Sequence, residues 1–360
     1  MHDGAPARAP EGALMFVLHV MPRLGPAERA MRSPRPSMEI AAAVLRAVMV
    51  AIPLWAAGCD DQDDASHRSD DAGEQAGAVA AVFLSQDEGR IEISRRDEYV
   101  AEMNRFDLQL RTGSLEPVTV DDYLRAMPPH VLEFSEGERQ RVTAALSTVL
   151  DRMAATGLKP PEDPAEVQLV RTDGKEEGDA LAYTRSASIF LCDGLFTMED
   201  ALFTHVIAHE LFHVWSRANP DVVRWPTHEA LGFVRAEDIS FPASLAERRI
   251  TNPDDPKVHE TIHVQLDGKP VEVFLAIMAS KDYEGGSLLD YIQLELIEPA
   301  SAASHPLDSA QGLFEQIGTT TPEILSAEEI SAEHFAIGLL QDRPINDPEL
   351  IEAVLRPFAQ

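Results

Sequence analysis

The spacing of apolar and polar positions changes along the chain, and each spacing predicts a type of element. Helical spacing predicts helices over 94–112, 136–156, 197–218, 326–342 and 347–356. Two strand-like runs lie within 167–192, joined around Asp173–Gly174, and 260–278 reads as a hairpin with Asp267–Gly268 as its tight turn. Because the strands mostly precede the later helices and few βαβ units occur, the pattern predicts an α+β fold with a helical C-terminal part.

The segment from Met31 to Cys59 has the pattern of an export signal. An arginine-containing stretch leads into a short apolar run, and small residues follow in WAAGC, which ends at Cys59. The run is too short for a stable membrane span. WAAGC resembles a bacterial lipoprotein box, in which the cysteine is acylated and becomes the N-terminus; an ordinary secretion signal is the alternative. We therefore expect translation to start at Met31, loss of residues 1–58, and a protein held by lipid in a bacterial cell envelope.

Charge and cysteine content narrow the remaining possibilities. Residues 59–79 are acidic with almost no apolar content, which predicts a disordered tether before a domain over 80–360. The formal net charge of −31 argues against nucleic acid as a partner and against electrostatic binding to anionic lipid. Once Cys59 is acylated only Cys192 remains, so no internal disulfide is expected.

Residues 205–215, HVIAHELFHVW, place three histidines at four-residue intervals in an apolar run. His209 and His213 bracket Glu210. On a helix, two imidazoles four residues apart can reach one metal ion, and Glu210 lies about 100° round the axis, beside the ion. This is the HExxH pattern of zinc hydrolases. His205 lies about 12 Å along the axis from His213, so we expect it to be a core residue or a partner of a ligand. Core histidines bonded to backbone carbonyls are the alternative for the whole group.

A catalytic zinc site needs a third protein ligand. The extended pattern HExxHxxGxxH is excluded, because Ser216 and Asn219 stand where its glycine and third histidine would be. A helical wheel over 326–342 places Glu329 and Glu333 in the middle of an apolar arc and turns the neighbouring polar residues elsewhere. Unpaired buried carboxylates are costly, and a metal ion together with a histidine N–H would satisfy both.

Two alternatives stay open for this third ligand. Ser326 and Glu329 also fit a capping box, which would make Glu329 a solvated residue of a first helical turn. Glu229, in the sequence THEALGF sixteen residues after His213, is a rival third ligand.

HExxH on one helix and EEISAE on a later one resemble the gluzincin class of zinc metallopeptidases, which is related to thermolysin-like enzymes. The resemblance covers about residues 180–340 and rests on these two motifs. It implies a zincin-like domain that holds Zn²⁺ through His209, His213 and Glu329. It also implies that Glu333 is the hydrogen-bonding partner of a ligand histidine. The second motif departs from the family's NExxAD pattern, since glutamates replace its Asn and its Asp.

These residues predict a zinc-dependent peptidase in which Glu210 acts as general base toward water. The strand ASIFLC, 187–192, is expected to offer an edge to the backbone of a peptide or protein substrate. The candidates for stabilising the oxyanion are Tyr283, Tyr291 and His263. The alternative from another class is a non-catalytic zinc-containing binding module on the cell surface, against which an intact Glu210 argues.

Overall fold

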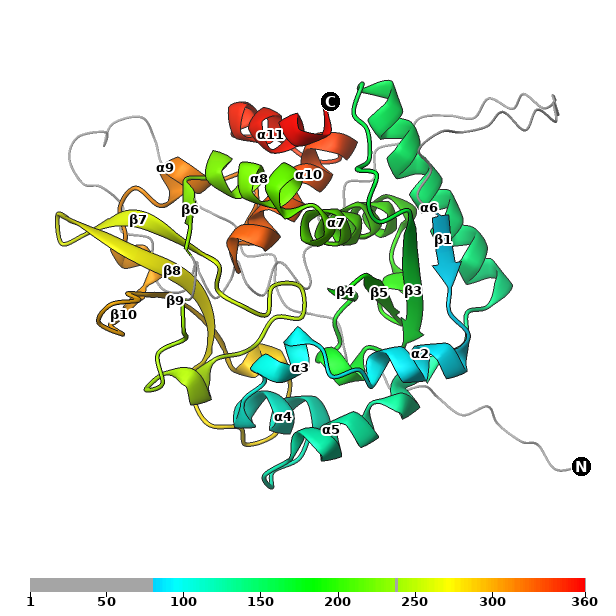
Figure 1. Ribbon diagram of the computed structural model, residues 1–360, viewed down its shortest axis with the longest axis horizontal. Helices are drawn as coiled ribbons and strands as arrows, with labels where there is room; N and C mark the ends of the chain where they lie inside the picture. The colour runs from blue at the N-terminus through cyan, green and yellow to red at the C-terminus, as the bar shows by residue number, and fades with distance from the viewer. Residues whose placement is uncertain (1–79, 237–238, 360) are drawn as a thin grey trace, which may run out of the picture. The chain divides into compact units, whose positions relative to one another are not determined.

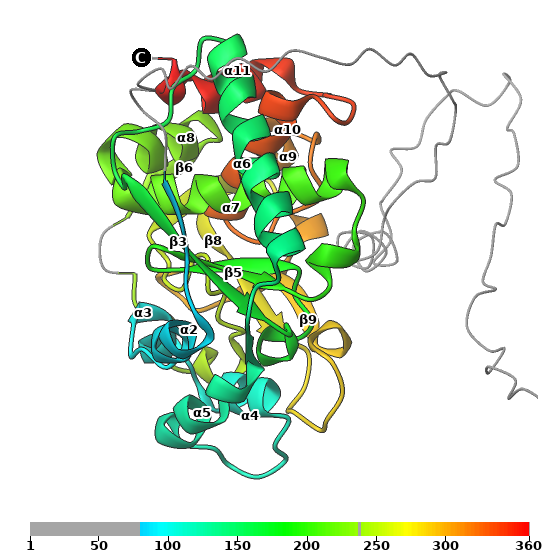
Figure 2. The same cartoon turned by 90° about the vertical axis from the view of Figure 1, so that its right-hand side faces the viewer.

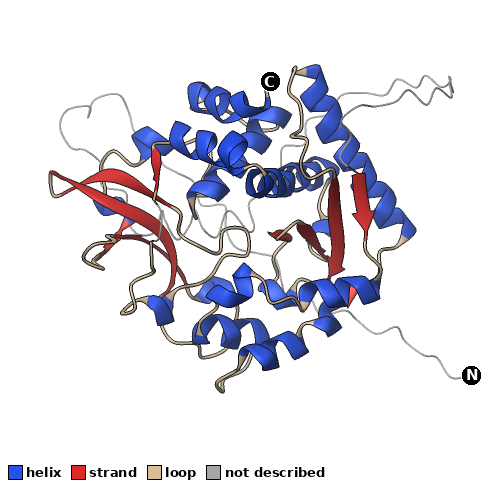
Figure 3. Cartoon of the chain, in the orientation of Figure 1, coloured by secondary structure: helices blue, strands red, loops and turns tan. Residues whose placement is uncertain are grey.

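The computed structural model describes residues 80–236 and 239–359 and shows an α+β fold (Figure 1). The expected signal, Cys59 and the acidic tether over 59–79 lie outside the described residues. Within the described residues, no helix is long and apolar enough to cross a membrane. Strands fall into two separate sheets, with helices around and between them (Figure 3).

The first sheet is mixed and has β4 at one end. Its strands are β1 (Ala80–Phe83), β2 (Val131–Leu132), β3 (Glu166–Thr172), β4 (Ala182–Arg185) and β5 (Ser188–Cys192). The order is β1-β3-β5-β4, with β1, β3 and β5 parallel, β4 antiparallel to β5, and β2 beside β3. The chain reverses between β4 and β5 at Ser186, whose φ is +55°.

Helices cover both faces of this sheet, so its strands are apolar on both sides. One face packs on α6 (Glu136–Ala155) and α7 (Asp200–Ala218), as Figure 2 shows for α6. The other face packs on α2 (Gln86–Ile93), α3 (Glu98–Glu102), α4 (Arg105–Thr112) and α5 (Val120–Ala126). Along β5, Ile189 and Leu191 join the first core while Phe190 and Cys192 join the second, as the alternation of a strand requires.

The second sheet is antiparallel throughout. Its strands are β6 (Phe233–Arg235), β7 (Glu260–Leu266), β8 (Lys269–Ala279), β9 (Ile292–Ile297) and β10 (Ser304–Pro306), in the order β10-β9-β8-β7-β6. The turn between β7 and β8 has positive φ at Asp267 (+50°) and Gly268 (+74°), the conformation that a two-residue hairpin favours. One face of this sheet joins the main core, and the other packs on residues from the 239–258 loop.

The remaining helices are α8 (Trp225–Ala230), α9 (Phe314–Ile317), α10 (Ala327–Leu340) and α11 (Pro348–Leu355), and a π-helical turn over Pro220–Arg224 joins α7 to α8. Among these helices, α10 packs on α7, and α11 packs on α10 and α8. Short 3-10 turns occur at Pro128–His130, Lys175–Glu177, Leu195–Thr197, Ala246–Arg248, Leu288–Asp290, Leu307–Ser309 and Arg356–Phe358. Helix α10 is buried on every side, from Ala327 to Leu339, and it packs against α7, which brings together the two motif-bearing segments.

Two predicted helix boundaries and one predicted strand position are wrong. The helix predicted over 94–112 is broken into α3 and α4, because Asn104 caps a new helix with its side chain and interrupts the first. Helix α7 begins at Asp200 after Glu199, without a side-chain cap, and Thr197 instead belongs to the preceding 3-10 turn. The strand ASIFLC is internal, since β5 pairs with both β3 and β4.

Candidate metal centre

Helices α7 and α10 bring His209, His213 and Glu329 together in the interior. His209 and His213 lie one turn apart on α7, and Glu329 lies in the first turn of α10. Glu329 Oε2 is 3.1 Å from His209 Nε2 and 3.6 Å from His213 Nε2. One ligand atom from each of the three lies within 4.8 Å of the others, and all three side chains are buried. These buried groups could hold a metal ion.

The hydrogen bonding of this group fits a bound cation. His213 Nε2 is buried and has no hydrogen-bond partner among the described residues, which is costly for a polar atom unless an ion or water meets it. Burial lowers the pKa of His213, but Glu329, Asp254 and Glu328 outweigh burial and raise it to about 10. Burial raises the pKa of Glu329, and the two histidines, His213 first, more than reverse that effect. The negative charge of Glu329 is therefore stabilised by positive charge at the position of the imidazoles.

Glu328 contacts the second histidine of the group, His213, on the side away from Glu329. Its Oε1 lies 3.2 Å from His213 Nδ1. Its Oε2 accepts hydrogen bonds from the side chains of Ser216 (2.8 Å), Arg224 (3.1 Å) and His228 (3.1 Å). The helical wheel turned Glu328 away from the apolar arc, and this was wrong, because α10 is buried all round rather than on one face. The sequence signal for a buried Glu328 was the presence of apolar residues on every side of the 326–342 helix. A helix of that kind is buried, and each charged side chain on it needs a partner.

Glu333 contacts the first histidine of the group, His209, in the same way. Its Oε2 lies 3.3 Å from His209 Nδ1 and 3.0 Å from His205 Nε2, and Arg343 Nη1 donates to its Oε1 at 2.8 Å. His205 Nδ1 in turn lies 2.8 Å from Asp342 Oδ2. His205 is therefore a buried partner of Glu333, as expected from its distance along α7 from His213.

Glu210 lies on the same helix but is held by the first sheet. Its Oε2 accepts a hydrogen bond of 2.7 Å from the Thr184 hydroxyl on β4. The backbone N–H of Thr184 donates to Asp254 Oδ1 at 2.5 Å. Burial raises the pKa of the Glu210 carboxyl, while His213 and His209 lower it. A carboxyl whose pKa is raised by burial beside a possible metal site has the properties of a general base.

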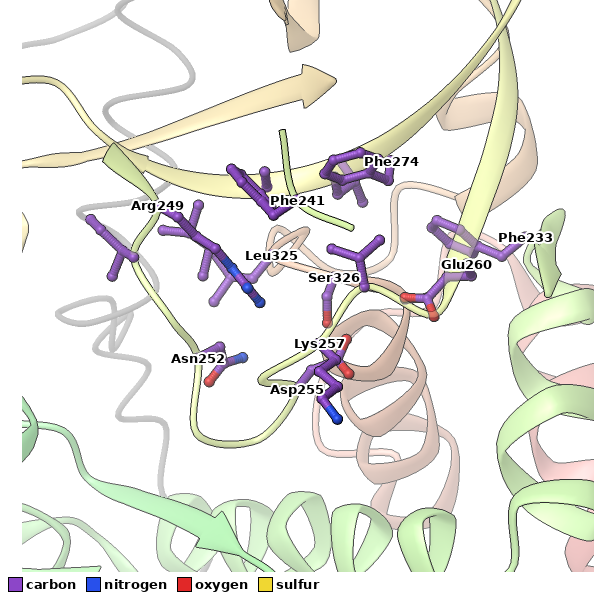
Figure 4. Close-up of a pocket in the computed structure, with 16 residues that line it drawn as sticks. Phe233, Phe241, Arg249, Asn252, Asp255, Lys257, Glu260, Phe274, Leu325 and Ser326 are labelled. Atoms are coloured by element: carbon purple, nitrogen blue, oxygen red, sulfur yellow. The ribbon is translucent and has the colours of Figure 1, made fainter. Parts of the chain in front are cut away.

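A cavity of about 530 Å³ opens over this group. Polar residues of the centre line it together with apolar side chains from several elements, among them Leu181, Leu202, Val206, Leu289 and Ile292. On its wall Asn252 Nδ2 donates to Glu329 Oε1 at 2.6 Å, which leaves Oε2 directed at the histidines. A smaller cavity adjoins Asn252 on its other side, between Phe241 and Phe274 above and Asp255 and Lys257 below (Figure 4).

The structure also places the remaining candidates. Ser326 caps α10 through the N–H of Glu329, but the Glu329 carboxylate points into the centre rather than into solvent. The rival ligand Glu229 is exposed on α8 and belongs to none of the possible metal groups among the described residues. His209, Glu323 and Glu333 form a second, overlapping group of possible ligands, and no motif in the sequence pointed to Glu323.

None of the three candidates for the oxyanion lines the large cavity. The Tyr291 hydroxyl donates to the Gly285 carbonyl at 2.6 Å and is packed against Tyr283. His263 is exposed on β7. Their selection was wrong because tyrosines and histidines were chosen by residue type, without information on which loops reach the centre.

Comparison of the chain with models of protein families, with curated proteins and with solved structures found no match. The site itself offers two imidazoles and a carboxylate buried beside a cavity, with the carboxyl of Glu210 next to them.

Proposed function

We propose that the protein is a zinc-dependent metallopeptidase. The observation that carries this proposal is the buried group of His209, His213 and Glu329, of which His209 and Glu329 line the large cavity and His213 lies behind them. Two imidazoles and one carboxylate are a ligand set of catalytic zinc, which keeps its fourth position for water or substrate. The overlapping resemblance to gluzincins supports the same ligand set from the sequence side.

Glu210 is the general base in this proposal. When bound, zinc would lower the pKa of water and polarise the carbonyl of the scissile bond. Glu210 would accept the proton of the attacking water and return it to the nitrogen of the leaving amine, so that one carboxyl group serves both transfers. Its hydrogen bond from Thr184 fixes one carboxylate oxygen, and the other is left for water.

The edge that receives the substrate is β4 rather than β5. β4 is the end strand of its sheet among the described residues, and its Ala182 lines the large cavity. The outward N–H of Thr184 is already bonded to Asp254, so Ala182, two residues away on the same edge, is the next residue that can pair with an extended peptide. In this arrangement the peptide would pair with β4, in either direction, and would pass beside the side chain of Glu210.

The decisive experiment separates metal binding from catalysis. Glu210→Gln should keep about one zinc per chain at this centre and lose hydrolysis of a peptide library, because it removes a base and no ligand. His213→Ala should lose the zinc at this centre and the hydrolysis. Full activity in Glu210→Gln would contradict the mechanism. Bound zinc without cleavage of any peptide by the unaltered protein would favour the alternative, a zinc-containing binding module.

A paired substitution tests the third ligand. Glu329→Ala should weaken zinc binding strongly, whereas Glu229→Ala on the exposed face of α8 should leave it unchanged. If Glu329 served only to cap α10, its replacement would lower the stability by about 1 kcal/mol and would leave zinc binding unchanged. Unchanged zinc affinity in Glu329→Ala would exclude the proposed ligand set.

We also propose that the peptidase is exported and lipid-anchored at Cys59. Mass spectrometry of the mature protein should find an acylated N-terminus at Cys59, and Cys59→Ser should release the protein from the membrane fraction. A mature protein that begins before Cys59 would contradict this.

A further inference from the structure

A second group of ligand-type side chains lies at the end of β3, separate from the candidate metal centre. His130 ends the 3-10 turn Pro128–His130, Asp173 follows β3, and Glu176 lies in the 3-10 turn Lys175–Glu177. His130 Nδ1 is 2.9 Å from Asp173 Oδ1. One ligand atom from each of the three residues lies within 4.8 Å of the other two. The group shares no residue with the centre formed by α7 and α10.

The buried carboxylate of Glu176 distinguishes this group from a surface ion pair. Its side chain is only 1% exposed. Oε1 accepts a hydrogen bond of 3.0 Å from the Tyr183 hydroxyl, but Oε2 is buried and has no hydrogen-bond partner among the described residues. A carboxylate in this position needs a positive partner.

The nearby lysine does not supply that partner. Lys175 Nζ lies 3.8 Å from Asp173 Oδ2, and its side chain is 71% exposed. The backbone N–H of Lys175 donates to Asp173 Oδ1 at 3.0 Å, which fixes the orientation of the Asp173 carboxylate. Asp173 Oδ1 therefore lies at His130, and Oδ2 has the ammonium of an exposed lysine as its neighbour.

We propose that His130, Asp173 and Glu176 bind a divalent transition-metal cation, of which zinc and manganese are the two that suit the ligands. Imidazole nitrogen favours zinc among the biological cations, and carboxylate oxygen suits manganese as well, whereas calcium prefers oxygen ligands alone. The side chains of His130 and Asp173 are 25% and 21% exposed, so an ion can enter from solvent and water can complete its coordination.

The ion at this second site has a structural role. Glu176 accepts a hydrogen bond from Tyr183 of β4, and β4 lies at the edge of the large cavity. The adjacent Glu177 accepts a hydrogen bond from Tyr99 of α3 and forms an ion pair with Arg111 of α4. A cation that links the 128–130 turn to the 175–177 turn would therefore brace the wall of the cavity that carries β4, at a distance from the residues that could do chemistry.

Zinc titration of the full chain tests the second site. The protein is stripped with a chelator and titrated with zinc against a chromophoric competitor, in the wild type and in the His213→Ala variant, which removes the first centre. His213→Ala should still bind about one zinc per chain. Adding Glu176→Gln or His130→Ala to it should weaken this remaining binding by more than about tenfold, the loss that even an outer partner of a metal ligand produces. A parallel titration with manganese distinguishes the two cations.

His305→Ala is the matched control, because His305 Nε2 lies 2.8 Å from Glu298 Oε1 in a histidine–carboxylate pair that belongs to no group of three possible ligands within 80–236 and 239–359. It should leave both zinc affinities unchanged. Zinc should also raise the thermal midpoint of His213→Ala, as a ligand of the folded state does, and should not raise that of the double variants. No zinc in folded His213→Ala, or equal affinity after Glu176→Gln, would overturn this second site while leaving the peptidase proposal intact. Zinc lost in His130→Ala but retained in His213→Ala would support the second site and contradict the first.

Discussion

Each histidine of the candidate metal centre directs its second ring nitrogen at a different carboxylate of α10. His213 Nδ1 faces Glu328 and His209 Nδ1 faces Glu333. With Nδ1–H donated in this way, each Nε2 faces Glu329 and would present its lone pair to a metal ion bound between them. The orientation of each Nε2 is therefore set by a carboxylate that contacts the opposite side of the ring.

Substitution of Glu328 should show this dependence. Glu328→Gln keeps the volume of the side chain but removes the charge that orients and polarises His213, so we expect zinc affinity to fall by about 10- to 100-fold. Isothermal titration calorimetry measures the change. Ser331→Ala is a control on the same helix, because the Ser331 hydroxyl is buried without a hydrogen-bond partner among the described residues, and it should bind zinc as tightly as the wild type. Equal affinity in Glu328→Gln would mean that helix packing alone orients the ring.

The buried carboxyl of Glu260, outside the candidate metal centre, predicts a dependence of the protein's stability on pH. Burial raises the pKa of Glu260 well above its ordinary value of 4.5, and Asp255 raises it further, although Arg224 lowers it. His228 donates Nε2–H to Glu328, which leaves His228 Nδ1 as an acceptor 3.8 Å from Glu260 Oε2. A protonated Glu260 therefore suits its surroundings.

Because the folded state holds this proton and the unfolded state releases it above pH 4.5, the contribution of Glu260 to stability is complete at low pH. It is lost as the pH rises toward the folded-state pKa, by up to about 1.4 kcal/mol per pH unit. Glu260→Gln carries a permanent donor and no charge, so its stability relative to the wild type should increase between pH 5 and pH 8. Urea unfolding at both pH values measures this. Glu315→Gln, exposed on α9, should show no such trend, and a constant difference for Glu260→Gln would contradict the prediction.

At the scale of elements, sequence pattern predicted helices and hairpins that depend on local signals. α6 ends as Gly157 and the prolines predict, and the β7–β8 turn has the geometry that Asp267–Gly268 favours. The failures are places where tertiary packing decides. Nothing local shows that β5 lies inside its sheet with β4 at the edge. Likewise, the wheel over α10 found Glu329 and Glu333 from their apolar neighbours, but it missed Glu328, whose partners come from α7 and α8.

The contact between α10 and α11 gives a prediction for a single glycine. A Cβ at Gly338 would lie 2.5 Å from Ile351 Cγ2 and 3.0 Å from Leu355 Cδ1 of α11. Gly338→Ala should therefore lower the free energy of unfolding by about 1–3 kcal/mol, the usual cost of overpacking a core, despite the better helix propensity of alanine. Gly137→Ala in α6 is the control, since no atom lies within 4 Å of its added Cβ. Urea unfolding of the two variants makes the comparison, and an unchanged or raised stability in Gly338→Ala would show that α11 can move aside.

At the scale of the whole molecule, the proposed ligands come from distant parts of the chain. His213 and Glu329 are 116 positions apart, and the entire second sheet lies between them. An ion that binds only when α7 and α10 are packed together stabilises the folded state over the unfolded one, by about 2.7 kcal/mol when free zinc is at 100 times its dissociation constant.

Removal of metal should therefore lower the thermal midpoint of the wild type by roughly 5–10 °C, taking about 2–4 °C per kcal/mol for a domain of this size. Differential scanning calorimetry with and without a chelator measures the decrease. The same treatment of His213→Ala should produce a smaller decrease. An identical decrease in the two proteins would place the stabilising ion somewhere other than between α7 and α10.

The separation of the ligands has a consequence in polymer terms. The chain from α7 to α10 is a ring that the ligands close, and the entropy of closing a flexible ring grows only with the logarithm of its length, about 0.6 kcal/mol for each doubling. A ring of 116 positions therefore costs little more to close than one half as long. The affinity for an ion depends on how α7 and α10 pack. The intervening β6–β10 segment can therefore change in length, at turns such as Asp267–Gly268, without weakening the binding of an ion between α7 and α10.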